Sequence, residues 1–154
     1  MRKALLFVSA TASFLVVVAL VAAAATQGVS EPTRIHVVEH ATTDTVVDTD
    51  GDGSDSTGDL LTFHNAVFGP RDEHRVGRDQ GECTRISPAR GTWQCRWTTF
   101  LGTGSISVEG PFFDARDSVF AITGGTGHFS NVRGQMLLRA RPGGEFDFIF
   151  EVQP

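Results

Sequence analysis

Apolar and polar residues alternate along most of the chain after residue 33. In the last strand-like segment, Phe146, Phe148, Phe150 and Val152 alternate with Asp147, Ile149 and Glu151. Because successive side chains of a strand point to opposite faces, a period of two predicts a strand with one buried face. No segment after residue 25 repeats apolar residues at helical spacing. The pattern therefore predicts an all-β domain.

Similar segments recur at short intervals, and residues typical of turns separate them. The expected strands cover residues 34–43, 60–68, 93–101, 106–108, 119–123, 132–140 and 146–152, with a weaker signal at 75–81. A glycine turn is expected at Gly124, Gly125 and Gly127, because glycine tolerates positive φ. It lacks the spacing of a phosphate-binding loop and precedes a strand, so we expect a structural hairpin. Many short strands with glycine-rich turns indicate a sandwich or a barrel.

The first 25 residues have the pattern of a secretory signal peptide. Arg2 and Lys3 form a charged start, the following residues are apolar apart from Ser and Thr, and Ala22–Ala25 supplies small residues for cleavage. An uncleaved membrane anchor is the alternative, because the apolar run is long enough to span a bilayer. We expect residues 1–25 to be removed. Residues 26–57 would then form a flexible tail, a first strand at about 34–43 and an acidic loop, and residues 58–154 the remainder of one domain.

Charge narrows the range of partners. Removal of Arg2 and Lys3 leaves 11 basic residues, all Arg, against 18 acidic ones, a net charge of −7. An acidic, exported domain is a poor partner for nucleic acid or for an anionic membrane surface. We therefore expect a secreted protein with no nucleic-acid partner and no stable membrane insertion after cleavage.

Residues 48–59, D-T-D-G-D-G-S-D-S-T-G-D, follow the order of an EF-hand calcium loop. The positions that supply ligands are occupied by Asp48, Asp50, Asp52 and Asp59, with Gly53 at the sharp turn. The fit is incomplete, because Asp55 replaces the usual apolar residue, the last position is Asp rather than Glu, and the flanks resemble strands. A solvated acidic loop and an incidental calcium site are both open interpretations.

The two cysteines lie on either side of a predicted turn at residues 87–91. This turn places Cys83 opposite Cys95 in a two-stranded hairpin, within reach of a disulfide. An exported chain with two cysteines favours the bond. A free Cys83 inside the domain is the alternative.

Two polar residues fall on the apolar faces of their strands. Glu39 shares a face with Ile35 and Val37, and Asn65 shares one with Phe63 and its apolar neighbours. An unpaired buried carboxylate is costly and a buried amide needs partners. Glu39 is therefore either a strand-end residue that reaches solvent or an inward functional acid. Asn65 is either bonded within the core or holds a ligand or water.

Other candidate chemistry is sparse. Trp93 and Trp97 share a face with Cys95, so these rings either fill the core or line a cavity. The histidines on polar strand faces, which could cluster outside the domain, are His36, His40 and His64. The sequence shows no Ser-His-Asp arrangement and no metal-ligand spacing apart from the acidic loop.

Several motifs in sequence order resemble a known superfamily. The segments S-V-E-G-P-F-F, A-I-T-G-G-T-G-H-F and R-G-Q between residues 107 and 135 resemble plant allene oxide cyclases, and G-G-T-G-x-F…R-G also resembles dirigent proteins. The runs G-D-L-L-T-F-H-N at 58–65 and R-V-G-R-D-Q-G-E-C at 75–83 match in the same order. The resemblance covers roughly residues 58–152. It implies a closed, antiparallel, eight-stranded β-barrel of calycin-like type, no cofactor and a homo-trimer.

The resemblance also implies a chemistry. Allene oxide cyclases enclose an unstable fatty-acid epoxide and steer its closure to a cyclopentenone with an inward Glu, asparagines that help hold a water, a Cys and an aromatic lining. By resemblance, the catalytic candidates are Glu39, Asn65 and Cys83, and the candidate ligand-binding aromatics are Phe63, Trp93 and Trp97. The match is incomplete, because Ala41 stands where the family has a second Asn and Val47-Asp48 where it has Ser-Pro. A disulfide at Cys83 would also remove the thiol.

These observations lead to one functional interpretation and two alternatives. The first is a secreted, cofactor-free barrel that binds a hydrophobic small molecule and steers its cyclisation or isomerisation. The second is a dirigent-like or ligand-binding barrel without turnover. Dirigent proteins are exported, whereas plant cyclases go to plastids, so the signal segment favours this comparison. The third is a calcium-stabilised structural or interaction protein.

Overall fold

The computed structural model describes residues 31–153, so the predicted signal segment lies outside the described part of the chain. The strands are β1 (Thr33–His40), β2 (Thr45–Val47), β3 (Leu60–Phe63), β4 (Ala66–Phe68), β5 (Arg75–Ser87), β6 (Thr92–Leu101), β7 (Gly104–Phe113), β8 (Ser118–Gly127), β9 (Arg133–Arg141) and β10 (Glu145–Gln153). A short 3₁₀ turn, η1 (Pro88–Arg90), connects β5 to β6. Between residues 31 and 153, no helix is both long and apolar enough to cross a membrane.

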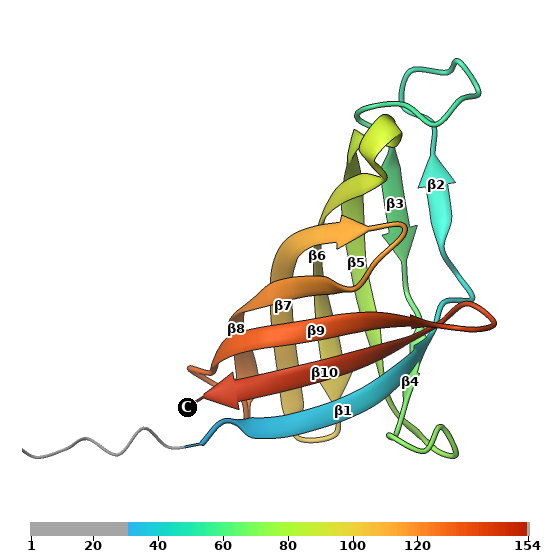
Figure 1. Cartoon of the computed structure of the whole chain (residues 1–154). Helices are drawn as coiled ribbons and strands as arrows, with labels where there is room; N and C mark the ends of the chain where they lie inside the picture. Colours follow the sequence, from blue (N-terminus) through green and yellow to red (C-terminus); the bar gives the residue numbers. More distant parts are fainter. Residues whose placement is uncertain (1–30, 154) are drawn as a thin grey trace, which may run out of the picture.

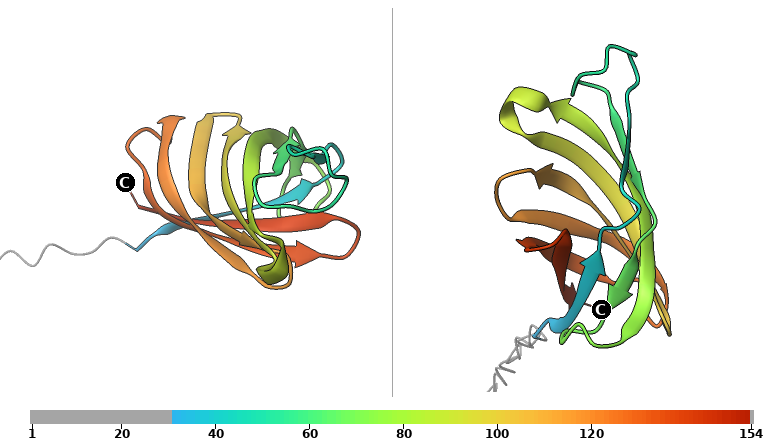
Figure 2. Two further views of the ribbon diagram at one scale, coloured as in Figure 1. Left: turned by 90° about the horizontal axis from the view of Figure 1, so that it is seen from above. Right: turned by 90° about the vertical axis from the view of Figure 1, so that its right-hand side faces the viewer.

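The strands close into an antiparallel β-barrel (Figures 1 and 2). Strands β5 to β10 pair in sequence order, β10 pairs with β1, and β1 pairs with β4, which returns to β5. Strands β3 and β4 both pair with β5 and act as one strand that is interrupted at His64 and Asn65. Strand β2 pairs only with β3 and lies outside the closed circuit. The circuit therefore has eight strand positions, which confirms the all-β, eight-stranded barrel expected from the sequence.

Side chains from the strands of the closed circuit fill the interior, whereas all three residues of β2 are exposed. In β10, Phe148, Phe150 and Val152 are buried, as the period of two predicts. Trp97 lies at the centre of the aromatic packing, with its ring centroid 4.4 Å from that of Phe120 and 5.4 Å from that of Phe148. Each fully buried aromatic side chain contributes roughly 2–3 kcal/mol from the removal of apolar surface from water. This core therefore fixes the register of the strands that carry the polar groups described below.

The glycine segment does not form the expected turn. Strand β8 continues through it to Gly127, and the chain reverses afterwards, at residues 128–132. A Cβ at Gly125 would collide with the main-chain oxygens of Ser105 and Phe129, and Gly127 has a φ of 60°. The glycines are needed for close approach to β7 and to the following turn. The sequence prediction was wrong here because glycine occurs both where the chain reverses and where another backbone approaches a strand too closely for a side chain. The sequence alone does not distinguish these two uses.

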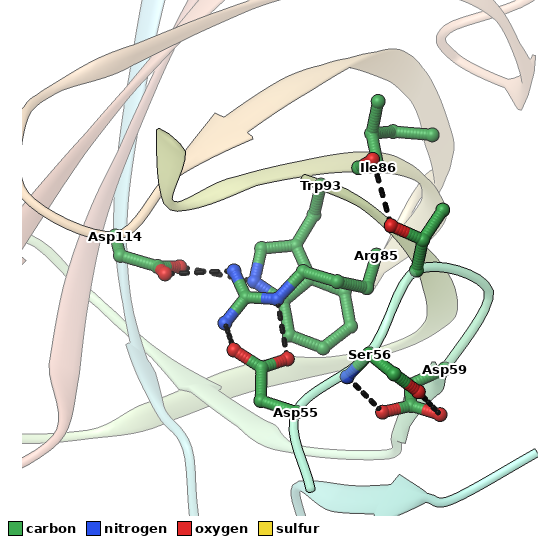
Figure 3. A network of polar contacts seen from close by, with 8 residues as sticks. Asp55, Ser56, Asp59, Arg85, Ile86, Trp93 and Asp114 are labelled. Atoms are coloured by element: carbon green, nitrogen blue, oxygen red, sulfur yellow. Dashed lines mark hydrogen bonds and ion pairs between the residues drawn. The ribbon is translucent and has the colours of Figure 1, made fainter. Parts of the chain in front are cut away.

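The acidic loop between β2 and β3 is tied to one end of the barrel (Figure 3). Arg85, whose side chain is only 9 % exposed, forms a bidentate ion pair with Asp55 from the loop and a 2.7 Å hydrogen bond to Asp114 beyond β7. Its guanidinium lies 4.1 Å from the centre of the Trp93 ring, and the Trp93 Nε1–H donates to Asp114. A planar, always-charged group suits this position, because it can pair with two carboxylates and stack on an aromatic face together.

Candidate functional site

Glu39 and Asn65 meet inside the barrel. Glu39 is on β1, and Asn65 is in the interruption between β3 and β4. Strand β4 pairs with β1 on one side and with β5 on the other. The Asn65 Nδ2 donates to Glu39 Oε1 at 2.8 Å, and the two residues are 5 % and 1 % exposed. Glu39 is therefore an inward acid rather than a rim residue that reaches solvent.

Asn65 also organises the chain around it. Its Oδ1 accepts hydrogen bonds from the main-chain N–H of Thr42 and Thr43 and from the Thr43 hydroxyl, at 2.9–3.0 Å. Its second Nδ2–H donates to Asp44 Oδ1 at 2.7 Å. A buried amide with every donor and acceptor used is a fixed element of structure. The interruption of the strand thus serves to turn the Asn65 side chain toward β1 and the segment that follows it.

A second buried acid, which the sequence analysis did not identify, lies beside Glu39. Asp79 on β5 is fully buried, and its Oδ1 accepts the Asn65 main-chain N–H at 3.1 Å. Its Oδ2 has no hydrogen-bond donor among the residues described. The signal was present, because Asp79 has the same strand parity as the inward Cys83, but the polar composition of residues 75–81 concealed it.

Burial dominates the protonation of both acids. It raises the pKa of Glu39 well above its ordinary value, and the nearby carboxylates of Asp79 and Asp44 raise it further. Burial also raises the pKa of Asp79 from 3.8 to about 6, although hydrogen bonds from Glu39 and Asn65 work in the opposite direction. A charged carboxylate loses hydration in the interior, so the neutral form of each acid is favoured.

Glu39 borders a small cavity whose walls are mainly apolar. The cavity has a volume of about 50 Å³ and is lined by Glu39, Asp44, Leu61, Phe63, Cys83, Cys95, Trp97, Phe112, Leu138, Phe146 and Phe148. This space is large enough for a few water molecules or for the reacting end of a ligand. Phe63 and Trp97 line this cavity, and their role in ligand binding stays a prediction. Trp93 does not line this cavity and packs against Arg85 instead.

Cys83 and Cys95 form a disulfide, as the hairpin register predicted. The residues lie directly opposite one another on β5 and β6, are both buried, and line the cavity. Cys83 consequently contributes a sulfur to the cavity wall but has no thiol that could act as an acid or a nucleophile.

The predicted calcium loop is only partly assembled. Carboxyl oxygens of Asp48, Asp50 and Asp52 lie within 4.8 Å of one another on the exposed loop. Asp59 instead accepts the main-chain N–H of Thr49 and Ser56, and these bonds lower its pKa. The fourth predicted ligand thus stabilises the base of the loop.

Two of the three candidate histidines bond different carboxylates. The His36 Nε2 is 2.8 Å from Asp147, and the His40 Nε2 is 2.7 Å from Asp72. The His40 nitrogen also lies within 4.8 Å of carboxyl oxygens of Asp72 and Glu145. Arg141, 3.5 Å from Glu145, places a fixed positive charge beside this group.

Comparison with known proteins identifies the family. The allene oxide cyclase family matches residues 35–141. The chain belongs to this family.

Solved structures share the fold at low sequence identity. A pyocyanin demethylase is 22 % identical with a TM-score of 0.65, and 77 % of this chain covers 100 % of it. A pterocarpan synthase dirigent protein is 19 % identical with a TM-score of 0.63, and the match covers 80 % of this chain and 94 % of that one. An exo-specific intermolecular Diels-Alderase is 13 % identical with a TM-score of 0.58, over 78 % of this chain and 96 % of that one. At these identities the likeness shows the barrel, and the chemistry must be argued from the site.

Proposed function

We propose that this protein is an exported, cofactor-free barrel that binds a hydrophobic small molecule and steers its cyclisation or isomerisation. The observation that carries the proposal is that Glu39, held by Asn65, is buried at the wall of an aromatic-lined cavity. Burying a carboxyl group costs stability, and Glu39 is buried without an ion-pair partner in residues 31–153.

The two parts of the site have different tasks. Aromatic walls hold a flexible apolar chain in few conformations, which lowers the entropic part of the barrier to ring closure. Glu39 presents the chemically active group, because it lines the cavity and has no ion-pair partner within residues 31–153. Asn65 fixes the orientation of Glu39. Preorganised dipoles in such a site act on charge that develops in the transition state.

The comparisons support this reading. The fold-level neighbours include a pterocarpan synthase dirigent protein, a Diels-Alderase and a cyclase that catalyses a [4 + 2] cycloaddition. The buried disulfide is compatible with an oxidising compartment, and the signal-like segment favours export. A homo-trimer is the assembly expected from the family resemblance.

The test is product configuration. The secreted protein is incubated with an allene oxide generated from a fatty-acid hydroperoxide and, separately, with a linear substrate that carries a diene and a dienophile. Products are separated by chiral chromatography. Wild type should accelerate closure of one probe and give one enantiomer in excess. Glu39→Gln should lower the rate by roughly 10²–10³-fold, within the usual range for loss of a positioned acid or base.

Glu151→Gln is the matched control, because this glutamate lies on the neighbouring β10 but bonds Gln135 on the outside of the barrel. It should leave rate and enantiomeric excess unchanged. Saturable binding of both probes with racemic product would instead make the protein a ligand-binding barrel without turnover. If neither probe binds and melting responds to calcium, the structural interpretation is the correct one.

A further inference from the structure

Three carboxyl groups converge on a site that offers them few donors. Glu39 comes from β1, Asp44 from the segment after it, and Asp79 from β5. The Asn65 amide supplies one N–H to Glu39 and one to Asp44, and its main-chain N–H goes to Asp79. Within residues 31–153, none of the three acids forms an ion pair with Arg or His. Negative charge in this cluster is therefore uncompensated.

The unpaired oxygen of Asp79 indicates that the acid cluster holds a proton. Asp79 Oδ2 is buried without a donor, and the hydroxyl of Thr99, its partner across β5 and β6, makes no bond either. Glu39 and Asp79 both accept from Asn65, Glu39 from the side-chain amide at 2.8 Å and Asp79 from the main-chain N–H at 3.1 Å, so the two carboxyl groups interact. Two carboxylates cannot bond one another, so a proton must lie between them for this contact to be favourable.

We propose that Glu39 and Asp79 share one proton at neutral pH, and that Glu39 delivers it to an uncharged oxygen of the bound substrate. This inference rests on the proposed function and specifies its substrate class: a hydrophobic molecule with an uncharged, hydrogen-bond-accepting oxygen at its reacting end. A carboxylate at that end is excluded by the negative cluster.

The proton balance of the step closes without a co-reactant. As the carbon–oxygen bond of the substrate breaks, or its π pair moves onto oxygen, that oxygen takes the Glu39 proton. The cyclised or isomerised intermediate then returns one proton to the Glu39 carboxylate. Asp79 does not line the cavity and acts through Glu39, so it is a positioning residue. Its negative charge keeps the proton on the pair when ordinary glutamates are ionised.

A second buried group favours a ligand with an acceptor. The indole N–H of Trp97 has no acceptor within the described residues, although Trp97 lines the cavity. An uncharged substrate oxygen could accept from this N–H as well as from Glu39. A hydrocarbon end would leave the Trp97 N–H without a partner, which is costly in a buried site.

Infrared spectroscopy tests the shared proton directly, with the whole secreted protein and no ligand. Wild type at pH 7 should show the carbonyl stretch of a protonated carboxyl group, shifted in D₂O. Glu39→Gln should lose it. Asp79→Asn should also lose it, because its amide donates to Glu39 and favours the carboxylate. Asp117→Asn, at an exposed acid paired with Arg139, should retain it. Absence of the band in wild type, or its persistence in Asp79→Asn, would overturn the proposal.

Small probes test the substrate class. 2-Cyclopentenone, cyclopentene and cyclopentanecarboxylate are titrated against wild type and Asp79→Asn. Wild type should bind the ketone about tenfold more tightly than cyclopentene, the value of one hydrogen bond of about 1.4 kcal/mol, and the carboxylate most weakly. Asp79→Asn should show a weaker preference for the ketone, because only the Trp97 N–H then remains to donate to it. Equal binding of ketone and carboxylate by wild type would contradict the assignment.

The two proposals fail separately. A carboxyl band without any turnover would leave the shared proton in place and reject the cyclase. Turnover that depends on Glu39 without the band would keep the cyclase and reject the shared proton.

Discussion

At the scale of single residues, the acid pair and the amide beside it explain why this part of the barrel is chemically different from the rest. Glu39 occupies an inward position whose register partners are Phe146 and Val67, and Asp79 one whose partner on β6 is Thr99. Each acid is held in place by Asn65 and not by a cation. Burial of these acids lowers the stability of the fold and keeps a carboxyl proton available at neutral pH.

The pH dependence of unfolding follows from the raised pKa of Asp79. The folded state binds a proton that the unfolded state releases between pH 3.8 and about 6. The free energy of unfolding should therefore fall as pH rises through this window. Asp79→Asn cannot lose a proton there. Its free energy of unfolding should equal that of wild type near pH 3.8. At neutral pH it should be higher by about 3 kcal/mol, since one pKa unit is worth about 1.4 kcal/mol.

Urea denaturation at a series of pH values measures this difference. Asp117→Asn serves as the control, because its side chain is 56 % exposed, and it should run parallel to wild type. If Asp79→Asn also runs parallel to wild type, Asp79 does not hold a proton in the folded state.

Replacement of Asn65 should be costly for a different reason. Asn65→Ala removes five side-chain hydrogen bonds and leaves Glu39 and the Thr42 and Thr43 amides without partners. We expect a loss of about 3–5 kcal/mol in unfolding free energy. His64→Ala, at the exposed neighbour in the same strand interruption, should cost less than about 0.5 kcal/mol. Similar losses for the two variants would show that Asn65 does not organise this segment.

The alternation of inward and outward positions along each strand identified only part of the site. It identified Glu39 and Asn65, because each stood among apolar residues of the same face. It missed Asp79, whose strand has Gly77 and Gly81 at the neighbouring inward positions and so shows no apolar face. It also missed Asp44, since a residue in an irregular segment has no periodicity. Which acids meet depends on the pairing of β1, β4 and β5. The alternation of residues along one strand does not show which strands become its neighbours.

At the scale of elements, alternation predicted most of the barrel strands because each has one face on the core. Strand β2 escaped prediction, because all three of its residues are exposed. The glycine run was placed in a turn because glycine serves both reversals and close packing. A strand was therefore predictable where one of its faces is buried and the other exposed. The ends of strands were not predictable in glycine segments, which have no side chains to alternate.

Arg85 should determine how firmly the acidic loop is held. Arg85→Lys keeps the charge but loses the bidentate pairing with Asp55 and the planar stack on Trp93. We expect a loss of about 1–3 kcal/mol in unfolding free energy and faster proteolysis in the loop. Limited proteolysis and urea denaturation measure the two effects.

Arg96→Lys is the control for this prediction. Arg96 pairs with Glu82 on the outer surface, with 74 % of its side chain exposed, so its change should cost less than about 0.5 kcal/mol. Equal cleavage rates in wild type and Arg85→Lys would mean that the loop is held by its own hydrogen bonds and not by the arginine.

At the scale of the whole molecule, closure places the two ends of the described chain side by side. Thr33 of β1 is the register partner of Val152 of β10, and the C-terminus lies beside the start of β1 (Figure 1). The barrel is consequently a nearly continuous ring of paired strands, in which any one connection is replaceable if the pairing is retained. This property gives a test of closure that does not involve the site.

A circular permutant should preserve the barrel. A short Gly/Ser linker joins Gln153 to Thr33, and the chain is opened between Gly102 and Thr103, in the exposed turn from β6 to β7. Exchanging one short connection for another alters loop-closure entropy by only about 1 kcal/mol. The permutant should therefore unfold in one cooperative transition, within about 1–2 kcal/mol of wild type, and keep the disulfide. Opening the chain between His64 and Asn65 should be far more damaging, since the Asn65 main chain bonds Asp79 through both N–H and C=O. If the two permutants are equally unstable, the β1–β10 seam does not close the barrel in solution.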